Sequence, residues 1–597
     1  MKVFIANKLA ILFGFWLFLS MFASSALAIA KFNTNYQVYY KVDSSGGTHV
    51  NFVISQKNNL SIVYATEFGI SINETRIANL KITDEGQVVT PVVQKNQNQT
   101  VISFPFAKKV VGKDKVHNFS IEYDTSDIVS KQGNTWQISI PRFESDENVT
   151  DQTAILSLPS NFPQPAYIDP RPDIVNGSTY YFSSKILANK PISAIFGKNQ
   201  FYKGTLQYFV KNNNDTEMEI PITLIPNTAY QKVYYEKIDP LPQNIEIDED
   251  GNLIAVYELT PGKEINVNTN VFIKTDFKPT QDSIEKRNSY LENNKIWNYD
   301  NNIFTIPEIK NLTSPKSIYD YVVNKLKYDY QKINPSGTSR DMASDSLKNY
   351  LSAICTDYTD LFISLARKAR IPARELEGLA VSENPDLKPI SDSQDVLHAW
   401  PEYYDEAKKQ WIQIDPTWGS TTRGLDYFNK LDFNHIVFAI HGLNPEFPPP
   451  AGSYRKPGSK EKDLNFEAIE EISFPQNDLV IEAGTSTLTN TTYTIKNKNG
   501  IYFSGNLDVP ETKTTYPQHE TINIPPLGKK QITLKNKALS FLFPQTTEVI
   551  INLNGKDYAV KGSTYNLFQK SGFFAIAGLI LGSLTLLARS LFFRRQK

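Results

Sequence analysis

Short runs in which apolar and polar residues alternate dominate the first half of the chain. Examples are 36–42, 101–106 and 253–259, and clusters of Gly, Asp, Asn and Ser separate many of these runs. Alternation with a period of two is typical of β-strands that bury one face. The pattern predicts an N-terminal β-domain at 29–147 and a second β-rich domain at 148–281. One further run, 61–65, is also expected to form a strand.

Strand-like runs return near the end of the chain, including 479–482, 492–495 and 547–553. A segment rich in proline, glycine and lysine at 448–462 precedes them and is expected to be a linker. About 100 residues of short strands is the size of an immunoglobulin-like β-sandwich. We therefore expect such a sandwich, acting as a stalk, at 463–567.

Helical periodicity is confined to residues between about 313 and 369. Ser314 and Pro315 are a favourable helix start, and the apolar residues after them recur with helical spacing. A second helix begins near Cys355. Strand-like segments follow it at 374–381, 398–404 and 411–414.

This mixture of helices and strands predicts an α+β domain at 303–447. A polar, asparagine-rich segment at 282–302 precedes it and is expected to be a linker or a surface helix. The whole chain is thus expected to be multidomain, with an α+β domain between β-domains.

The composition limits the chemistry that this chain can carry. The 597 residues include 62 Lys and Arg against 63 Asp and Glu, which gives a net charge of −1. This balance offers no basic excess for nucleic acid, so no nucleic-acid partner is expected. A single cysteine forbids intramolecular disulfides and excludes zinc fingers and iron–sulfur clusters.

No metal or cofactor is expected from the sequence. It contains no His-Glu-x-x-His motif, and one cysteine with scattered histidines offers no complete zinc ligand set. The run 248–252 is acidic, but it lacks the spacing and closing glutamate of a calcium loop. We interpret it as a hairpin turn. The oligomeric state is left open.

Both ends of the chain are apolar. Residues 1–28 have the pattern of a secretory signal peptide cleaved after Ala28, with an overlapping site at Ala30 and an uncleaved anchor as the alternative. No charge occurs from 571 to 588, and a span at 571–593 followed by a basic tail at 594–597 predicts one transmembrane helix. The expected localisation is a single-pass membrane protein, with an extracytoplasmic ectodomain and a cytoplasmic C-terminus.

The lone cysteine is placed where a nucleophile would be favoured. Cys355 lies at the first turn of a predicted helix, where unpaired backbone N–H groups and the helix macrodipole stabilise a thiolate. His398 and Asp415 follow on neighbouring predicted strands, where the carboxylate could orient the imidazole as it takes the proton from Cys355. Tyr328 and Tyr330 are weaker candidates for polarising a substrate carbonyl. His435 and His441 are interpreted as ordinary surface or packing residues.

Five segments within about 65 residues resemble those of bacterial and archaeal transglutaminase-like domains. They are Ala353-Ile354-Cys355-Thr356-Asp357-Tyr358, the helical run 361–367, Ile371-Pro372-Ala373-Arg374, His398-Ala399-Trp400, and the run 411–419 that ends Asp415-Pro416-Thr417-Trp418-Gly419. The resemblance covers roughly 301–447. It implies a papain-like α+β fold, with Cys355, His398 and Asp415 as a catalytic triad. Asp357 and Arg374 also match family positions, and we interpret both as structural residues.

The sequence departs from the family pattern at four positions. Ala353 stands two residues before the cysteine, where the family usually has glycine, and Thr356 stands just after it, where the family usually has glycine or tryptophan. Arg370 stands where the family prefers glycine. Pro401 follows His398-Ala399-Trp400 and lacks a ladder donor, which suggests an edge strand or a bulge. None of these departures removes a member of the triad.

Two functions remain open at this point. The first is a membrane-anchored thiol enzyme that acts on a protein or peptide substrate, attacking peptide or side-chain amides through a thioester on Cys355. Water would then release an acid, whereas an amine would be cross-linked, and the sequence does not choose between these outcomes. The alternative is a non-catalytic surface binding or adhesion protein that uses the transglutaminase-like fold as a scaffold.

Overall fold

The computed structural model of the chain describes residues 31–95, 99–141, 148–187, 190–279, 287–332, 340–381, 397–422, 426–429, 431–458, 463–487, 489–537, 546–563 and 572–594. The expected signal peptide at 1–28 lies outside these residues. The structure is mostly β-strand (49%) with few helices (13%). It divides into two compact units, one formed by residues up to 131 with 136–196, and the other by 132–135 with the chain from 197 onward.

The first unit is built almost entirely of strands. Its elements are β1 (Phe32–Val42), β2 (Thr48–Asn58), β3 (Glu67–Ile72), β4 (Ile77–Asp84), β5 (Gln87–Val89), β6 (Val92–Lys95), β7 (Thr100–Pro105), β8 (Val116–Thr125), β9 (Val129–Gln132), β10 (Thr135–Ile140), β11 (Val149–Ser157), β12 (Pro165–Asp169), β13 (Ile174–Asn176), β14 (Thr179–Phe182), α2 (Ser184–Leu187) and β15 (Ile192–Phe196). The expected strand at 61–65 is absent, and this stretch is irregular.

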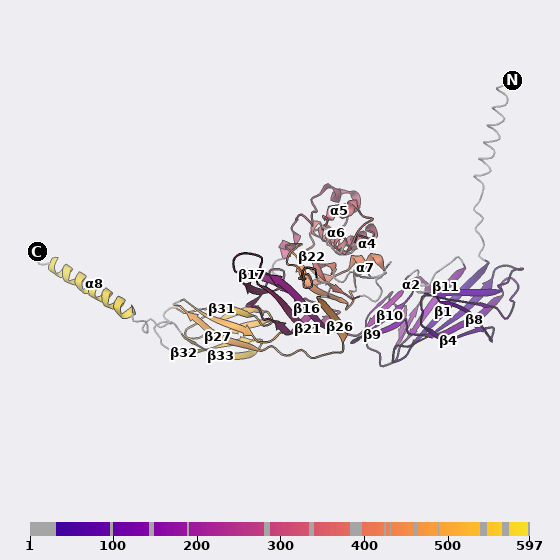
Figure 1. Cartoon of the computed structure of the whole chain (residues 1–597), viewed down its shortest axis with the longest axis horizontal. Helices are drawn as coiled ribbons and strands as arrows, with labels where there is room; N and C mark the ends of the chain where they lie inside the picture. Colours follow the sequence, from indigo (N-terminus) through magenta and orange to yellow (C-terminus); the bar gives the residue numbers. More distant parts are fainter. Residues whose placement is uncertain are drawn as a thin grey trace, which may run out of the picture. The chain divides into compact units, whose positions relative to one another are not determined.

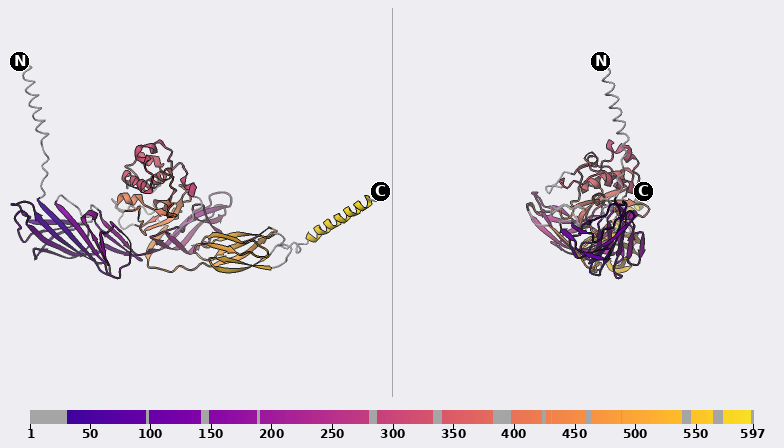
Figure 2. Two further views of the ribbon diagram at one scale, coloured as in Figure 1. Left: turned by 180° about the vertical axis from the view of Figure 1, so that it is seen from behind. Right: turned by 90° about the vertical axis from the view of Figure 1, so that its right-hand side faces the viewer.

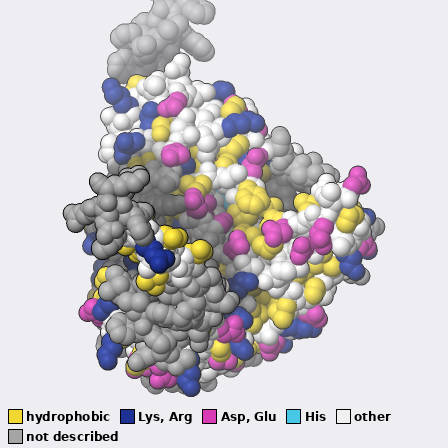
Figure 3. All heavy atoms as spheres, turned by 90° about the vertical axis from the view of Figure 1, so that its left-hand side faces the viewer, with side chains coloured by type: hydrophobic (Ala, Val, Ile, Leu, Met, Phe, Trp, Pro, Cys, Tyr) yellow, Lys and Arg dark blue, Asp and Glu magenta, His cyan; other side chains and the backbone are white. Residues whose placement is uncertain are grey.

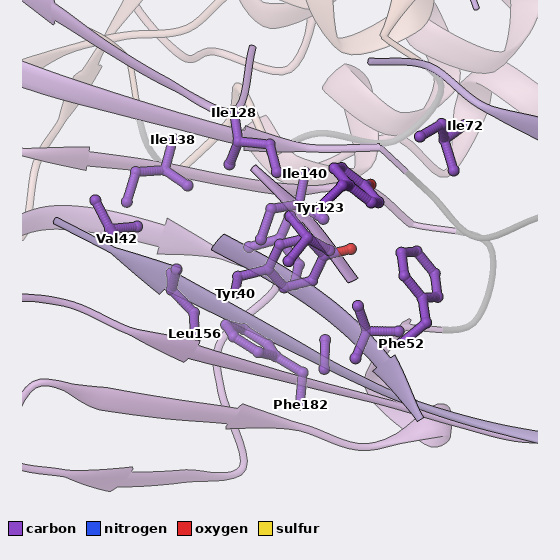
Figure 4. Close-up of a cluster of buried hydrophobic side chains, with 14 of the residues drawn as sticks. Tyr40, Val42, Phe52, Ile72, Tyr123, Ile128, Ile138, Ile140, Leu156 and Phe182 are labelled. Atoms are coloured by element: carbon purple, nitrogen blue, oxygen red, sulfur yellow. The ribbon is translucent and has the colours of Figure 1, made fainter. Parts of the chain in front are cut away.

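An eight-stranded sheet in the order β13-β14-β11-β1-β2-β8-β4-β5 forms most of this unit, with smaller sheets β12-β15-β10-β9 and β3-β7-β6 beside it. Figure 4 shows inward-facing side chains of β1, β2, β8 and β10 meeting in the core, where Tyr40, Phe52 and Ile140 are buried. β11 pairs in parallel with β1. Strands on both sides of the expected boundary at 147/148 therefore share one sheet.

The second unit begins with a two-sheet sandwich. Its strands are β16 (Asn199–Lys211), β17 (Met218–Leu224), β18 (Gln231–Asp239), β19 (Asn244–Ile247), β20 (Leu253–Leu259), β21 (Glu264–Asp276) and β26 (Leu464–Ile469). They form the sheets β18-β21-β16-β26 and β17-β20-β19. Because β26 follows the helical region in the chain but pairs with β16, the helical region is an insertion into this sandwich.

The inserted α+β region contains every helix from η1 to α7. Its elements are η1 (Arg287–Leu291), η2 (Asn302–Thr305), α3 (Pro307–Lys310), α4 (Pro315–Lys325), α5 (Ala343–Lys348), α6 (Cys355–Lys368), β22 (Ala373–Ala380), β23 (His398–Asp405), β24 (Gln410–Gln413), α7 (Pro416–Thr421) and β25 (His435–His441). As expected, Ser314 caps α4, because its side chain accepts a hydrogen bond from the N–H of Ser317.

The strands of this region form one sheet in the order β24-β23-β22-β25. Helix α6 packs on β22 and β23. In Figures 1 and 2, helices α4, α5 and α6 gather on one side of β22, and β16 and β21 lie on the other. Ile436 and Phe438 of β25 are buried in the core of the sandwich, so the sheet lies between the helices and the sandwich.

Two sequence features behave differently from expectation in this region. The segment 282–302, expected to be a linker, contributes Tyr290 and Trp297 to the interior, and the guanidinium of Arg367 lies 4.2 Å from the centroid of the Trp297 ring. Pro401 lies on the inner strand β23 rather than on an edge. It is tolerated because β24 pairs only from Glu402 onward, beyond the proline.

A separate sandwich follows at the C-terminal side. It consists of β27 (Leu479–Ser486), β28 (Asn490–Asn497), β29 (Phe503–Val509), β30 (Gln518–Ile524), β31 (Lys529–Lys535), β32 (Thr546–Leu553) and β33 (Lys556–Ser563). The sheets are β27-β28-β31 and β30-β29-β32-β33, and Tyr493, Leu507 and Ile551 lie in the core between them.

The structure corrects the expected C-terminal transmembrane helix. Helix α8 (Gly572–Arg594) is present. A membrane span needs about 20 consecutive, predominantly apolar residues, and among the residues that the structure describes no helix is both long and apolar enough to cross a membrane. The expected fold class was therefore wrong in including a span at 571–593, and the single-pass localisation that depended on it was also wrong.

The described surface mixes the two signs of charge. On the described part of the face in Figure 3, Lys and Arg side chains are interspersed with Asp and Glu side chains. This arrangement matches the near-equal numbers of basic and acidic residues in the sequence.

Candidate active site

Cys355 is the first residue of α6, and its side chain is largely buried, with 7% of the residue exposed. The helix begins here because Ile354 is extended and the carboxylate of Asp357 accepts a hydrogen bond from the N–H of Ile354 (2.8 Å). Lys332 and Ser346 donate to the same carboxylate at 2.8 and 2.9 Å. Asp357 therefore has the structural role expected for it.

The segment before the helix brings a tyrosine close to the thiol. Ala353 donates to the carbonyl of Lys327 (3.0 Å) and accepts from the N–H of Asp329 (2.9 Å), which fixes Tyr328 between them. Burial raises the pKa of Tyr328, and Cys355 adds to the rise. Tyr330 is half exposed, and its ring meets the ring of Tyr328 edge-on at 4.8 Å.

The structure brings His398 between Cys355 and Asp415. Nε2 of His398 lies 3.0 Å from Oδ2 of Asp415. The thiol of Cys355 also interacts with this imidazole and helps to raise its pKa. Burial alone would lower the pKa of His398. Asp415 and, after it, Cys355 raise the pKa by more than burial lowers it, to about 9. The three residues of the expected triad are therefore in contact in the expected order.

Asp415 is held from three directions. It caps α7, with Oδ1 accepting from the N–H of Trp418 at 3.0 Å, while Oδ2 faces two imidazoles, His398 at 3.0 Å and His435 at 3.3 Å. Burial would raise the pKa of this carboxyl, yet His398 and His435 hold it well below its ordinary value. Asp415 is thus anionic and fixed in orientation.

His435 is the residue that sequence reasoning missed. It is fully buried at the start of β25, and its second nitrogen, Nδ1, lies 2.8 Å from Oδ1 of Asp432. His435 is therefore not a surface residue, and besides packing in the interior it is hydrogen-bonded to Asp415 and Asp432. The signal available in the sequence was a carboxylate three residues before a histidine that lies in an apolar strand.

Two tryptophans enclose both imidazoles. The ring of His398 stacks against those of Trp400 and Trp418, with centroids 5.8 and 5.4 Å away. The ring of His435 lies 4.8 and 4.6 Å from the same two indoles. Aromatic faces carry negative electrostatic potential, so this setting favours the protonated imidazoles.

The cluster has the composition of a metal site, and its ligand atoms also contact one another. Single ligand atoms of His398, Asp415 and His435 lie within 4.8 Å of one another. Each of these atoms already takes part in a hydrogen bond with another member of the cluster. We therefore assign these residues to a hydrogen-bonded network.

Arg374 has the structural role expected for it. Its Nε donates to Oε1 of Glu402 at 2.6 Å, and its guanidinium lies 4.2 Å from the centroid of the Trp411 ring. The pair is buried between β22 and β23, next to Tyr290. Arg374 thus stabilises the sheet that presents His398.

Comparison with known proteins identifies this region. The family model described as the transglutaminase-like superfamily matches residues 304–416, which include Cys355, His398 and Asp415. A comparison with curated proteins found no match.

Several solved structures match parts of the chain at low identity. A proposed cysteine protease from Cytophaga hutchinsonii is 16% identical, with a TM-score of 0.29 over 46% of this chain and 98% of that chain. The periplasmic domain of TgpA from Pseudomonas aeruginosa, bound to ethylmercury, is 14% identical, with a TM-score of 0.21 over 37% and 90%. Native leukotriene A4 hydrolase from Saccharomyces cerevisiae is 12% identical, with a TM-score of 0.20 over 29% and 30%.

These TM-scores are too low to carry a functional argument, and the family match stands independently of them. The chain therefore contains a domain of the transglutaminase-like superfamily at residues 304–416.

Proposed function

We propose that this protein is a thiol enzyme that acts on peptide or side-chain amides through a thioester at Cys355. The observation that supports the proposal is the arrangement of three residues, in which the Cys355 thiol interacts with His398 and His398 is hydrogen-bonded to Asp415. The three residues come from α6, β23 and the cap of α7, so separate elements of the fold converge on this arrangement. A nucleophile, a base and an orienting carboxylate are the parts that such catalysis needs.

In the first step, His398 accepts the thiol proton and Sγ of Cys355 attacks the amide carbonyl carbon. The carbon–nitrogen bond breaks, His398 gives the proton to the leaving amine, and a thioester remains. Asp415 keeps its charge and stabilises the imidazolium throughout. Tyr328, whose pKa the Cys355 thiol helps to raise, and the half-exposed Tyr330 are the candidates for positioning the carbonyl oxygen.

In the second step, water or a primary amine attacks the thioester carbonyl and gives its proton to His398. The carbon–sulfur bond breaks, and the thiolate of Cys355 regains a proton from His398. Water yields a carboxylic acid, so the protein would be a peptidase or amidase. An amine yields a new amide, so it would be a transglutaminase. Both outcomes use the same intermediate.

The test is incubation of the purified protein with labelled peptides that contain glutamine, with and without a labelled primary amine. Mass spectrometry would distinguish the two products, because hydrolysis and incorporation of the amine change the mass of the peptide by different amounts. The Cys355→Ala variant is the control for uncatalysed reaction, and a thioester trapped at Cys355 by acid quench would identify the intermediate. If neither product forms across a broad peptide library, the scaffold alternative replaces this proposal.

A further inference from the structure

The active-site network continues beyond Asp415 to a second histidine that the proposed mechanism does not use. Oδ2 of Asp415 faces Nε2 of His435 at 3.3 Å, and Nδ1 of His435 faces Oδ1 of Asp432 at 2.8 Å. Asp432 is itself fixed by the N–H of Asn434 at 2.9 Å and by the hydroxyl of Tyr427. Both nitrogens of His435 thus point at carboxylate oxygens.

An imidazole with a carboxylate on each nitrogen is best satisfied when both nitrogens carry a proton and donate. A neutral ring would direct a lone pair at one of the two carboxylates in a fully buried site. Burial alone would lower the pKa of His435. Asp432 and Asp415 raise the pKa by more than burial lowers it, to about 9.

We propose that His435 is a positioning residue of this site, whose imidazolium, anchored on Asp432, holds the Asp415 carboxylate toward His398. The inference rests on the function proposed above. Asp415 has two oxygens, and the N–H of Trp418 engages Oδ1. His435 is the second donor, besides His398, at Oδ2, so it fixes the oxygen that His398 needs.

His435 also changes the charge that His398 experiences. The charged and titratable groups facing His435 are Asp432 in the loop before β25, Asp415 at the cap of α7 and His398 on β23. With His435 protonated, part of the negative charge of Asp415 is neutralised. His398 therefore holds its proton less tightly than it would beside an isolated carboxylate, and it returns the proton to the leaving amine more readily.

The test compares His435→Ala, which removes the donor, with His435→Gln, which keeps a neutral amide able to donate to Asp415. We expect His435→Ala to lower kcat by about 10- to 100-fold with little change in KM, as for other residues that orient a ligand or catalytic group. His435→Gln should restore most of kcat at pH 7. In this variant the alkaline limb of the kcat/KM profile should move to higher pH. The glutamine amide does not titrate, and without the cation beside Asp415 His398 holds its proton more tightly.

The matched control is His441→Gln, a second buried histidine on β25 whose partners are Glu375 and the carbonyl of Pro448. It should affect stability but leave the pH profile of turnover in place. If His435→Gln gives a profile that superimposes on that of the wild type, or if folded His435→Ala keeps full kcat, the positioning role is overturned. Should His435→Ala not fold, the profile of His435→Gln decides alone.

A second readout separates this inference from the proposed function. The rate of alkylation of Cys355 by iodoacetamide, followed against pH, needs no amide turnover and reports the titration of His398 through an inflection. We expect the inflection to move to higher pH in His435→Gln and to stay in place in His441→Gln. A wild type without amide turnover would refute the proposed function, whereas an unmoved inflection would refute the link through His435.

Discussion

Asn252 forms a pair of hydrogen bonds with the backbone of Ile440, although the two residues lie in different parts of the second unit. Its Oδ1 accepts from the N–H of Ile440 at 2.7 Å, and its Nδ2 donates to the carbonyl at 2.8 Å. Gln231 makes the same pair with Val437, at 2.9 Å in both directions. Two side-chain amides of the sandwich thus replace a neighbouring strand along the free edge of β25.

This relationship matters because β25 begins with His435. An unpaired edge strand buried against another domain would leave its N–H and C=O groups unsatisfied, which costs about 1–3 kcal/mol for each group. The hairpin turn at 248–252 supplies one of the two amides. The acidic run that superficially resembled a calcium loop is therefore a docking turn, in which Asp250 also accepts from the N–H of Gly442 at 2.9 Å.

We expect Asn252→Ala to lower the free energy of unfolding by about 2 kcal/mol, because it removes both hydrogen bonds to Ile440 and a third to Asp248, and leaves two buried backbone groups unpaired. Urea unfolding followed by tryptophan fluorescence would measure the loss. Asn213→Ala is the control, since Asn213 is exposed and its replacement should change stability by no more than about 0.5 kcal/mol. Equal stability of the two variants would contradict the docking role.

Local patterns in the sequence were sufficient for the elements that carry the triad. Helix α6 starts at Cys355 as expected, and β22, β23 and β24 lie where their apolar runs predict strands. The reason is that capping, periodicity and turn chemistry act over a few residues. The order Cys355, His398 and Asp415 could then be inferred from adjacent strands.

Features that depend on distant contacts were not predicted. The role of His435 arises because β25 pairs with β22, which places the imidazole beside Asp415. The segment 282–302 looked like a linker because it is polar on average, yet single side chains such as Trp297 reach the core. The return of β26 to the first sandwich of this unit also follows from a long-range pairing, which no local pattern encodes.

The triad variants should fail to different degrees. Cys355→Ala removes the nucleophile and should abolish amide turnover. His398→Ala removes the base and should lose nearly as much amide turnover. Asp415→Asn keeps an oxygen for the N–H of Trp418, so α7 stays capped while the charge beside His398 is lost. We expect its kcat to fall by about two to four orders of magnitude, less than for the other two. Steady-state kinetics with a fluorogenic amide would rank the three.

Asp405→Asn is the control for the third variant, because Asp405 is a carboxylate at the opposite end of β23 from His398, where it pairs with Lys408. It should retain turnover. Wild-type turnover by Cys355→Ala would refute the nucleophile. A silent Asp415→Asn would instead remove only the orienting role of Asp415.

Thermal stability should fall as the pH rises through about 9. His398, His435 and His441 are buried beside carboxylates, and although burial lowers the pKa of each, the partners raise it to about 9. Since an unfolded histidine has a pKa of about 6.5, the folded state binds these protons more tightly. Their contribution is complete below pH about 6.5 and is lost as the pH rises through 9. Calorimetry should give a declining Tm between pH 7 and 10, and a constant or rising Tm would contradict this reading of the cluster.

Arg370 occupies a backbone conformation that favours glycine. It follows the C-terminal end of α6 with a φ of 63°, in the left-handed region. The N–H of Arg370 bonds the carbonyl of Arg367 at 3.0 Å, and the N–H of Ile371 bonds that of Ala366 at 2.9 Å. These two bonds form a Schellman motif, in which glycine is the usual residue at this position. The glycine that the family prefers here therefore has a conformational reason.

We expect Arg370→Gly to raise the free energy of unfolding by about 0.5–1 kcal/mol. A non-glycine residue in this conformation costs about 1–2 kcal/mol, and the added freedom of glycine in the unfolded chain offsets part of the gain. Lys368→Gly, two residues earlier in the last helical turn, should instead destabilise the protein by about 1 kcal/mol. Urea unfolding of both variants would measure the difference. Amide turnover should be unchanged in Arg370→Gly, because Arg370 lies at the opposite end of α6 from Cys355. A loss of stability in Arg370→Gly would show that contacts of the arginine side chain outweigh the strain in its backbone.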